Sequence, residues 1–172
     1  AMRKEFPRAR VCVRYSLGPG LFITVDGMEE PFNEEAALKV ETEMRRLVRL
    51  KLPLERRRIS IKEALSFYEQ DGQADKAKLL KWRRFSYFDV YQIDGYMDYF
   101  YGEMAPDTSY ADVFRVKYVH DGAVVLLMPR SDAPDVPSDY VDLPKLHAVF
   151  HQSDEWGKLM ECATVNDLNT HI

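Results

Sequence analysis

The amino-terminal quarter of the chain shows two kinds of hydrophobic pattern. Residues 10–16 (RVCVRYS) and 21–26 (LFITVD) are rich in β-branched and aromatic side chains, a composition typical of strands. Gly18-Pro19-Gly20 separates them, so we expect a strand pair with a tight link. From Ala37 to Val48 the apolar positions step by three and four, which predicts one face of an amphipathic helix.

Three helices are predicted before residue 83. Asn33 is placed to cap the first of them, and Pro53 follows its end. Ser60 and Glu63 stand three residues apart in a capping-box sequence, which opens the second helix. The third follows the break at Asp71-Gly72. The expected ranges are 33–50, 60–69 and 73–82.

The middle of the chain changes to short runs of aromatic and β-branched residues. The runs are SYFDVYQI (86–93), YMDYFYG (96–102), DVFRVKYV (112–119) and AVVLLMP (123–129). Asp121-Gly122, between the last two runs, is a strong hairpin signal. Because helices precede these strands and the strands follow one another, we expect an α+β fold, an antiparallel sheet packed on helices.

The carboxy-terminal quarter has a different composition. Residues 129–144 contain four prolines and four aspartates, which predicts a loop. From Pro144 the segments PKLHAVF, DEWGKLM and TVNDLNTHI predict two or three short helices.

Composition excludes several classes of protein. No apolar run approaches the roughly 20 residues that a membrane span needs, and no signal-peptide pattern opens the chain. Cys12 and Cys162 lie in no spaced motif, so we expect reduced thiols in a cytoplasmic protein without membrane partners. Ala1 before Met2 resembles a cloning scar, and we expect the chain to be a fragment.

The net charge is −4, which does not indicate a nucleic-acid binder. Basic residues are nevertheless concentrated: residues 44–58 carry seven of them against one acid, and residues 76–84 carry five with no acid. These clusters are either solvated helix faces or a surface that binds phosphate, RNA or an acidic segment.

Most catalytic motifs are missing. The only Gly-Lys pair, Gly157-Lys158, lacks the rest of a phosphate-binding loop, and no dinucleotide or Gly-x-Ser-x-Gly motif is present. His147 and His151 have the spacing of a zinc-binding helix, but no glutamate follows His147; two surface histidines are the alternative. The sequence therefore predicts no catalytic residue, no metal and no cofactor in this chain.

Several segments together carry a resemblance over nearly the whole chain. They are SLGPGLFITVDG (16–27), LPLERRRISIKEAL (52–65), DGQADKAKLLKWR (71–83), DGYMDYFYGEMAPDTSY (94–110), FRVKYV (114–119), and the tail PKLHAVFHQSDEWGKLM with TVNDLN. The chain resembles the second, editing-type domain of threonyl-tRNA synthetases, and more closely its counterpart before the P-loop domain of bacterial uridine kinase-like proteins. The resemblance implies the α+β fold of the domain common to threonyl- and alanyl-tRNA synthetases.

The resemblance also implies that the editing chemistry is lost. The synthetase motif Asp-Leu-Cys-x-Gly-Pro-His falls on residues 98–104, where Asp98 and Gly102 are kept. Phe100 stands at the cysteine position and Met104 at the histidine position, and neither can bind zinc or transfer a proton. If the strand continued to residue 104, both side chains would fill an apolar, closed pocket.

The implied organisation is an editing-like domain over residues 1–130, with a loop and short helices over 131–172 that link it to a kinase domain. ATP and Mg²⁺ are expected only for that kinase domain, which is also the expected partner. A nucleoside, nucleotide or RNA is a further candidate partner. The candidate binding residues are Tyr96, Asp98, Tyr99, Tyr101, Arg83 and Arg84.

Three roles remain open on the sequence. The first is a non-catalytic binding or regulatory domain of a uridine kinase-like nucleoside kinase. The second is a module that binds tRNA or other RNA, and the third is a residual aminoacyl-tRNA hydrolase. The tyrosines either stack on a base or pack in the sheet with hydroxyls at its rim.

Overall fold

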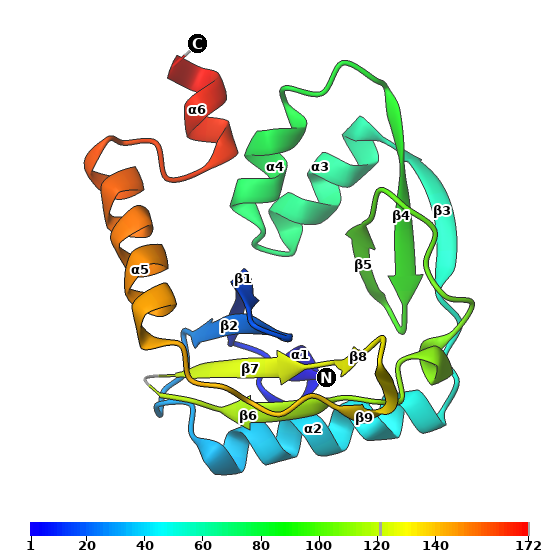
Figure 1. The fold of residues 1–172 in the computed structure, drawn as a ribbon. Helices are drawn as coiled ribbons and strands as arrows, with labels where there is room; N and C mark the ends of the chain where they lie inside the picture. The colour runs from blue at the N-terminus through cyan, green and yellow to red at the C-terminus, as the bar shows by residue number, and fades with distance from the viewer. Residues whose placement is uncertain (121, 172) are drawn as a thin grey trace. The chain divides into compact units, whose positions relative to one another are not determined.

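The computed structural model describes residues 1–120 and 122–171, which form two compact units. Unit 1 consists of Ala1–Pro53 and Asp107–His147, and unit 2 of Leu54–Pro106 and Ala148–Ile172. Each unit combines helices with antiparallel strands (Figure 1), which confirms the predicted α+β class. The predicted division into residues 1–130 and 131–172 stays a prediction.

Unit 1 is built on a four-stranded antiparallel sheet. Its strands, in spatial order, are β1 (Arg10–Leu17), β2 (Gly20–Asp26), β7 (Ala123–Leu127) and β6 (Arg115–Tyr118). The predicted link between β1 and β2 is present, with Gly18 at φ 57°. Gly20 pairs with Leu127, and a Cβ on it would lie 2.5 Å from Cγ1 of Val125. Only glycine therefore fits at Gly20 without displacing β7.

Helix α2 (Glu34–Arg49) packs along this sheet, below β6 in the view of Figure 1. The side chain of Asn33 accepts a hydrogen bond from the Ala36 amide, as the N-cap prediction requires. Both faces of β7 are buried, because Val124 packs against α2 while Val125 belongs to a second cluster. The short helix α1 (Met2–Glu5), which has no sequence signal, joins the α2 side of this core.

The remaining elements of unit 1 are short. They are the 3₁₀ helix η1 (Thr108–Tyr110), β8 (Pro129–Arg130), β9 (Ala133–Pro137) and the first turn of α5 (Pro144–Leu159). Strands β8 and β9 form a hairpin inside the segment expected to be a loop. The turn predicted at Asp121-Gly122 includes residue 121, which lies outside the described residues, although β6 and β7 do pair antiparallel.

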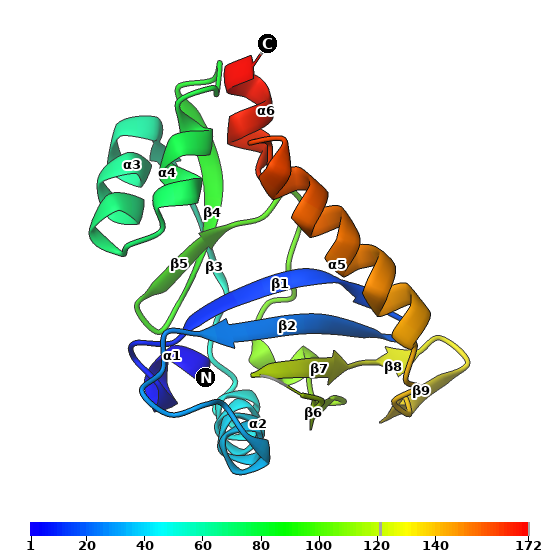
Figure 2. The ribbon, with the colours of Figure 1, turned by 90° about the vertical axis from the view of Figure 1, so that its left-hand side faces the viewer.

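Unit 2 contains a second antiparallel sheet, with the order β3 (Glu55–Ser60), β4 (Tyr87–Ile93), β5 (Tyr96–Tyr99). Helices α3 (Ile61–Gln70) and α4 (Ala74–Leu80) lie side by side (Figure 2) and bury Ala64, Tyr68 and Leu80 with sheet residues. Helix α6 (Val165–His171) contacts α4, and Trp82, just beyond the end of α4, donates from Nε1 to Asn166 Oδ1 over 3.1 Å. None of the described helices is long and apolar enough to cross a membrane.

Candidate functional site

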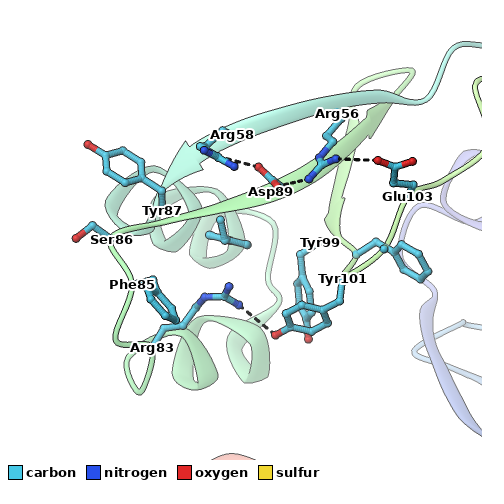
Figure 3. Close-up of a pocket in the computed structure, with 13 residues that line it drawn as sticks. Arg56, Arg58, Arg83, Phe85, Ser86, Tyr87, Asp89, Tyr99, Tyr101 and Glu103 are labelled. Carbon is cyan, nitrogen blue, oxygen red and sulfur yellow. Dashed lines mark hydrogen bonds and ion pairs between the residues drawn. The ribbon is translucent and has the colours of Figure 1, made fainter.

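An open cleft in unit 2 lies along the sheet and the turn after α4. Its volume is about 610 Å³, within the range of small-molecule sites. Figure 3 shows the side chains that border it, which come from β3, β4, residues 83–86, the end of β5 and the segment after it. The lining residues are Arg56, Arg58, Arg83, Phe85, Ser86, Tyr87, Phe88, Asp89, Tyr99, Phe100, Tyr101, Gly102 and Glu103.

Two of the three arginines share one carboxylate. Arg56 and Arg58 stand at alternate positions of β3, and Arg58 pairs with Asp89 in the sheet register. The Asp89 carboxylate accepts from Arg56 Nη2 over 2.6 Å and from Arg58 Nε over 3.1 Å. These two bonds hold the pKa of Asp89 below its usual range. Asp89 is thus anionic at neutral pH and is a poor general acid or base there.

The third arginine, Arg83, is held by aromatic rings. Its guanidinium carbon lies 4.9 Å from the Phe88 ring centroid and 5.6 Å from that of Tyr101, distances of cation–π contacts. Arg83 Nη1 also donates to the Tyr101 hydroxyl over 3.1 Å, and Figure 3 shows these two side chains facing each other. Tyr99 packs edge-on against Tyr101, and burial raises the pKa of its hydroxyl.

Asp98 does not line the cleft. Its carboxylate accepts hydrogen bonds from Lys76 Nζ at 2.6 Å, from the Tyr96 hydroxyl at 3.1 Å and from the Tyr68 hydroxyl at 3.4 Å. The backbone amide of Tyr99 donates to it as well. Burial, and then the Asp98 charge, raise the pKa of Tyr68. Asp98 is therefore a half-buried anchor that joins β5 to α3 and α4.

The prediction of a closed apolar pocket at Phe100 and Met104 is wrong. Phe100 is 52% exposed and Met104 is 41% exposed. The physical reason is that β5 ends at Tyr99, so the alternation of strand faces does not reach residue 104. Instead the segment folds back over β4, where the Tyr91 hydroxyl donates to Gly102 O and accepts from Met104 N, both at 3.1 Å.

The structure brings together only some of the predicted binding residues. Tyr99, Tyr101 and Arg83 line the cleft with Phe100. Arg84 is exposed and is not among the lining residues. Tyr96 and Asp98 belong to the anchor beside α4. Whether any of these residues binds a ligand stays a prediction.

Sequence reasoning missed Arg56, Arg58, Phe85, Tyr87 and Asp89 as residues of one site. The signal for the first two was the alternation in ERRRIS: in an extended segment, Arg56 and Arg58 share a face. No local pattern indicates Asp89, because its role depends on the pairing of β4 with β3.

Within the described part of the chain, no group of three or more His, Cys, Asp or Glu side chains is placed to hold a metal ion. His147 hydrogen-bonds through Nδ1 to the Tyr15 hydroxyl, and its ring lies 5.1 Å from that of His120. His147 therefore has a partner other than the His151 that shares its spacing.

Comparison with known proteins finds partial similarity to one kind of enzyme. The threonine–tRNA ligase of Carboxydothermus hydrogenoformans is 29% identical over 124 residues, and those of Geobacter sp. (strain M21) and Lawsonia intracellularis are each 27% identical over 116 residues. Each similarity covers 67% of this chain. No family model matches the chain.

About two thirds of the chain is therefore similar to a segment of threonine–tRNA ligases. The similarity extends over 18% of the length of each of these ligases. It supports the resemblance to threonyl-tRNA synthetases drawn from the sequence motifs. It does not bear on the resemblance to uridine kinase-like proteins.

Proposed function

We propose that this chain is a non-catalytic binding domain of a larger protein, and that its cleft in unit 2 recognises a ligand or a partner group. The observation that carries the proposal is the chemistry of the cleft. Three guanidinium groups and several aromatic rings line it, and Asp89, one of its two acids, is bound by two of those guanidinium groups. Such a set of side chains binds planar or anionic groups.

The segment that follows β5 supports the loss of chemistry. Phe100 and Met104 stand where the resemblance places a thiol and an imidazole, and a phenyl ring or a thioether cannot act as base, nucleophile or zinc ligand at neutral pH. Asp98, the motif acid that is kept, is occupied by four hydrogen-bond donors.

We further propose that the host protein is a uridine kinase-like nucleoside kinase. The motif resemblance supports this host, and phosphoryl transfer with ATP and Mg²⁺ would then belong to a P-loop domain elsewhere in that protein. Here the chain would act as an accessory domain whose partner is the kinase domain.

The test combines two measurements. The isolated chain is incubated with mischarged tRNA at neutral pH, and we expect no release of the amino acid above the rate without protein. Kinase activity of the host protein is then measured with and without residues 1–172, where we expect a changed nucleoside affinity or rate. Deacylation by the chain would refute the non-catalytic role; unchanged kinase parameters would refute regulation.

A second candidate is an RNA-binding module, favoured by the similarity to ligases whose names state that they act on tRNA. Binding to RNA through phosphates releases counterions, so its affinity falls steeply as salt rises. A salt-dependent affinity for tRNA would support this candidate. An affinity that is absent or independent of salt would count against it.

A further inference from the structure

Arg83 differs from the other two arginines of the cleft in having no carboxylate partner among the residues that the structure describes. Arg56 and Arg58 both bind Asp89, whereas the contacts of Arg83 within the described residues are the Tyr101 hydroxyl and two aromatic rings. Its Nε is buried and has no hydrogen-bond acceptor. A buried N–H without an acceptor is unfavourable, so the guanidinium fork is left with unused donors.

An oxyanion is the group that these donors suit. The fork of a guanidinium presents pairs of parallel N–H groups that match two oxygens of a phosphate or carboxylate. An oxyanion that replaces the Tyr101 hydroxyl would satisfy two N–H groups of Arg83 in place of one. Arg58, whose side chain is 72% exposed, borders the same cleft and adds positive charge.

Exposed aromatic faces provide the second half of the site. Tyr101 is 80% exposed and Phe85 is 75% exposed, although aromatic side chains of this size are usually more buried. Figure 3 shows Phe85 beside Arg83, and Tyr101 on the opposite side of that guanidinium. A planar ring that stacks on either face would remove apolar surface from water.

Size and charge favour a small ligand with one anionic group. The volume of about 610 Å³ is enough for a single nucleotide. Three guanidinium groups and the carboxylates of Asp89 and Glu103 line the cleft, which leaves one net positive charge. That balance suits one phosphate, whereas a polyanion needs several unneutralised basic groups.

We propose that the cleft binds a nucleoside monophosphate, with the phosphate on Arg83 and the base stacked on Tyr101 or Phe85. The inference rests on the proposed binding function and names its ligand class. Arg83 is the residue that selects for the phosphate, and the aromatic rings accept different bases because every base has a stacking face.

The test is a titration of the isolated chain by calorimetry, with four probes. Uridine monophosphate is the ligand, uridine lacks the phosphate, ribose 5-phosphate lacks the base, and a single-stranded RNA of ten nucleotides presents several phosphates. We expect the monophosphate to bind most tightly, and to bind Arg83→Gln at least about tenfold more weakly. Uridine should bind wild type and Arg83→Gln alike.

Arg84→Gln is the matched control, since it removes the same charge from the adjacent, exposed position outside the cleft. We expect its affinity for uridine monophosphate to stay within about twofold of wild type. Tyr101→Ala should weaken both uridine and its monophosphate, whereas Tyr101→Phe keeps the ring and should bind the monophosphate at least as well as wild type.

If Arg83→Gln fails to fold, amide chemical shifts of the wild-type chain show instead whether the monophosphate binds in the cleft. Uridine monophosphate should then shift the amides of residues 83–89 and 99–103 ahead of all others. No binding of the monophosphate, equal binding by Arg83→Gln, or tighter and steeply salt-dependent binding of the RNA would each overturn the proposal. None of these results involves deacylation, so a failure here is separable from a failure of the non-catalytic role.

Discussion

Asp98 illustrates how a motif residue can keep its identity and change its task. The resemblance places it in a motif whose other reactive positions hold Phe100 and Met104. In the structure its carboxylate is held by Lys76, by two tyrosine hydroxyls and by one backbone amide. The arrangement indicates a structural role, because each of the two carboxylate oxygens already accepts from two donors.

We therefore expect Asp98→Asn to lower the free energy of unfolding by roughly 1–3 kcal/mol, since Lys76 loses its counter-charge at a half-buried position. The measurement is urea denaturation followed by fluorescence at pH 7. Glu69→Gln, an exposed carboxylate of α3, is the control and should change stability by no more than about 0.5 kcal/mol. Equal stability of Asp98→Asn and wild type would contradict the structural role.

At the scale of elements, the sequence was sufficient to predict features that depend on interactions between residues close together in the chain. The caps at Asn33 and Ser60 formed as predicted, because an N-cap depends on a side chain and an amide three residues apart. Asp94-Gly95, which links β4 to β5, is a further local signal of this kind: both residues have positive φ, as a two-residue hairpin link requires.

Elements fixed by distant pairing escaped prediction. Strand β3 has a charged sequence, ERRRIS, without the usual strand composition, and it exists because it pairs with β4. The cleft could not be predicted for the same reason, because Arg56 and Arg58 reach Asp89 only through the pairing of β3 with β4. Two helices, α5 and α6, form from the tail, as one of the two expected numbers has it, and α5 runs through both PKLHAVF and most of DEWGKLM without a break at Gly157.

Ser60 provides a test at this scale, since it ends β3 and caps α3. Its Oγ accepts from the Glu63 amide over 3.1 Å, while the Glu63 carboxylate lies 3.9 Å from Arg57. Ser60→Ala should lower the free energy of unfolding by about 1 kcal/mol. Ser66→Ala, the same change at an exposed position inside α3, should leave it equal or slightly higher. Thermal melts followed by circular dichroism decide between them, and equal effects would argue against the cap.

Over the whole molecule, carboxylates with a lowered pKa make the stability depend on pH. Carboxylates whose pKa is lowered occur in both units, among them Asp107 in unit 1 and Asp89 in unit 2. The largest shift belongs to Glu43 of α2, whose side chain is 7% exposed. Hydrogen bonds from Arg46, and then from Lys4, lower the pKa of Glu43 from 4.5 to about 2 despite its burial.

A lowered pKa fixes the sign of the effect. Above pH 4.5 Glu43 is ionised in both the folded and the unfolded chain, and its stabilising contribution is complete; as pH falls from 4.5 towards about 2 the contribution is lost. The contribution of these acids to the free energy of unfolding should therefore be constant between about pH 6 and pH 8 and should decrease below about pH 4.5.

Glu43→Gln should be less stable than wild type at pH 7 by at most about 3 kcal/mol, and this difference in stability should be smaller at pH 3. Urea denaturation at both pH values measures it, with the exposed Glu30→Gln expected to follow wild type throughout. If the difference in unfolding free energy between wild type and Glu43→Gln did not change with pH, the contribution of Glu43 would come from its packing. Its charge-assisted bonds to Lys4 of α1 and Arg46 of α2 would then not be the cause.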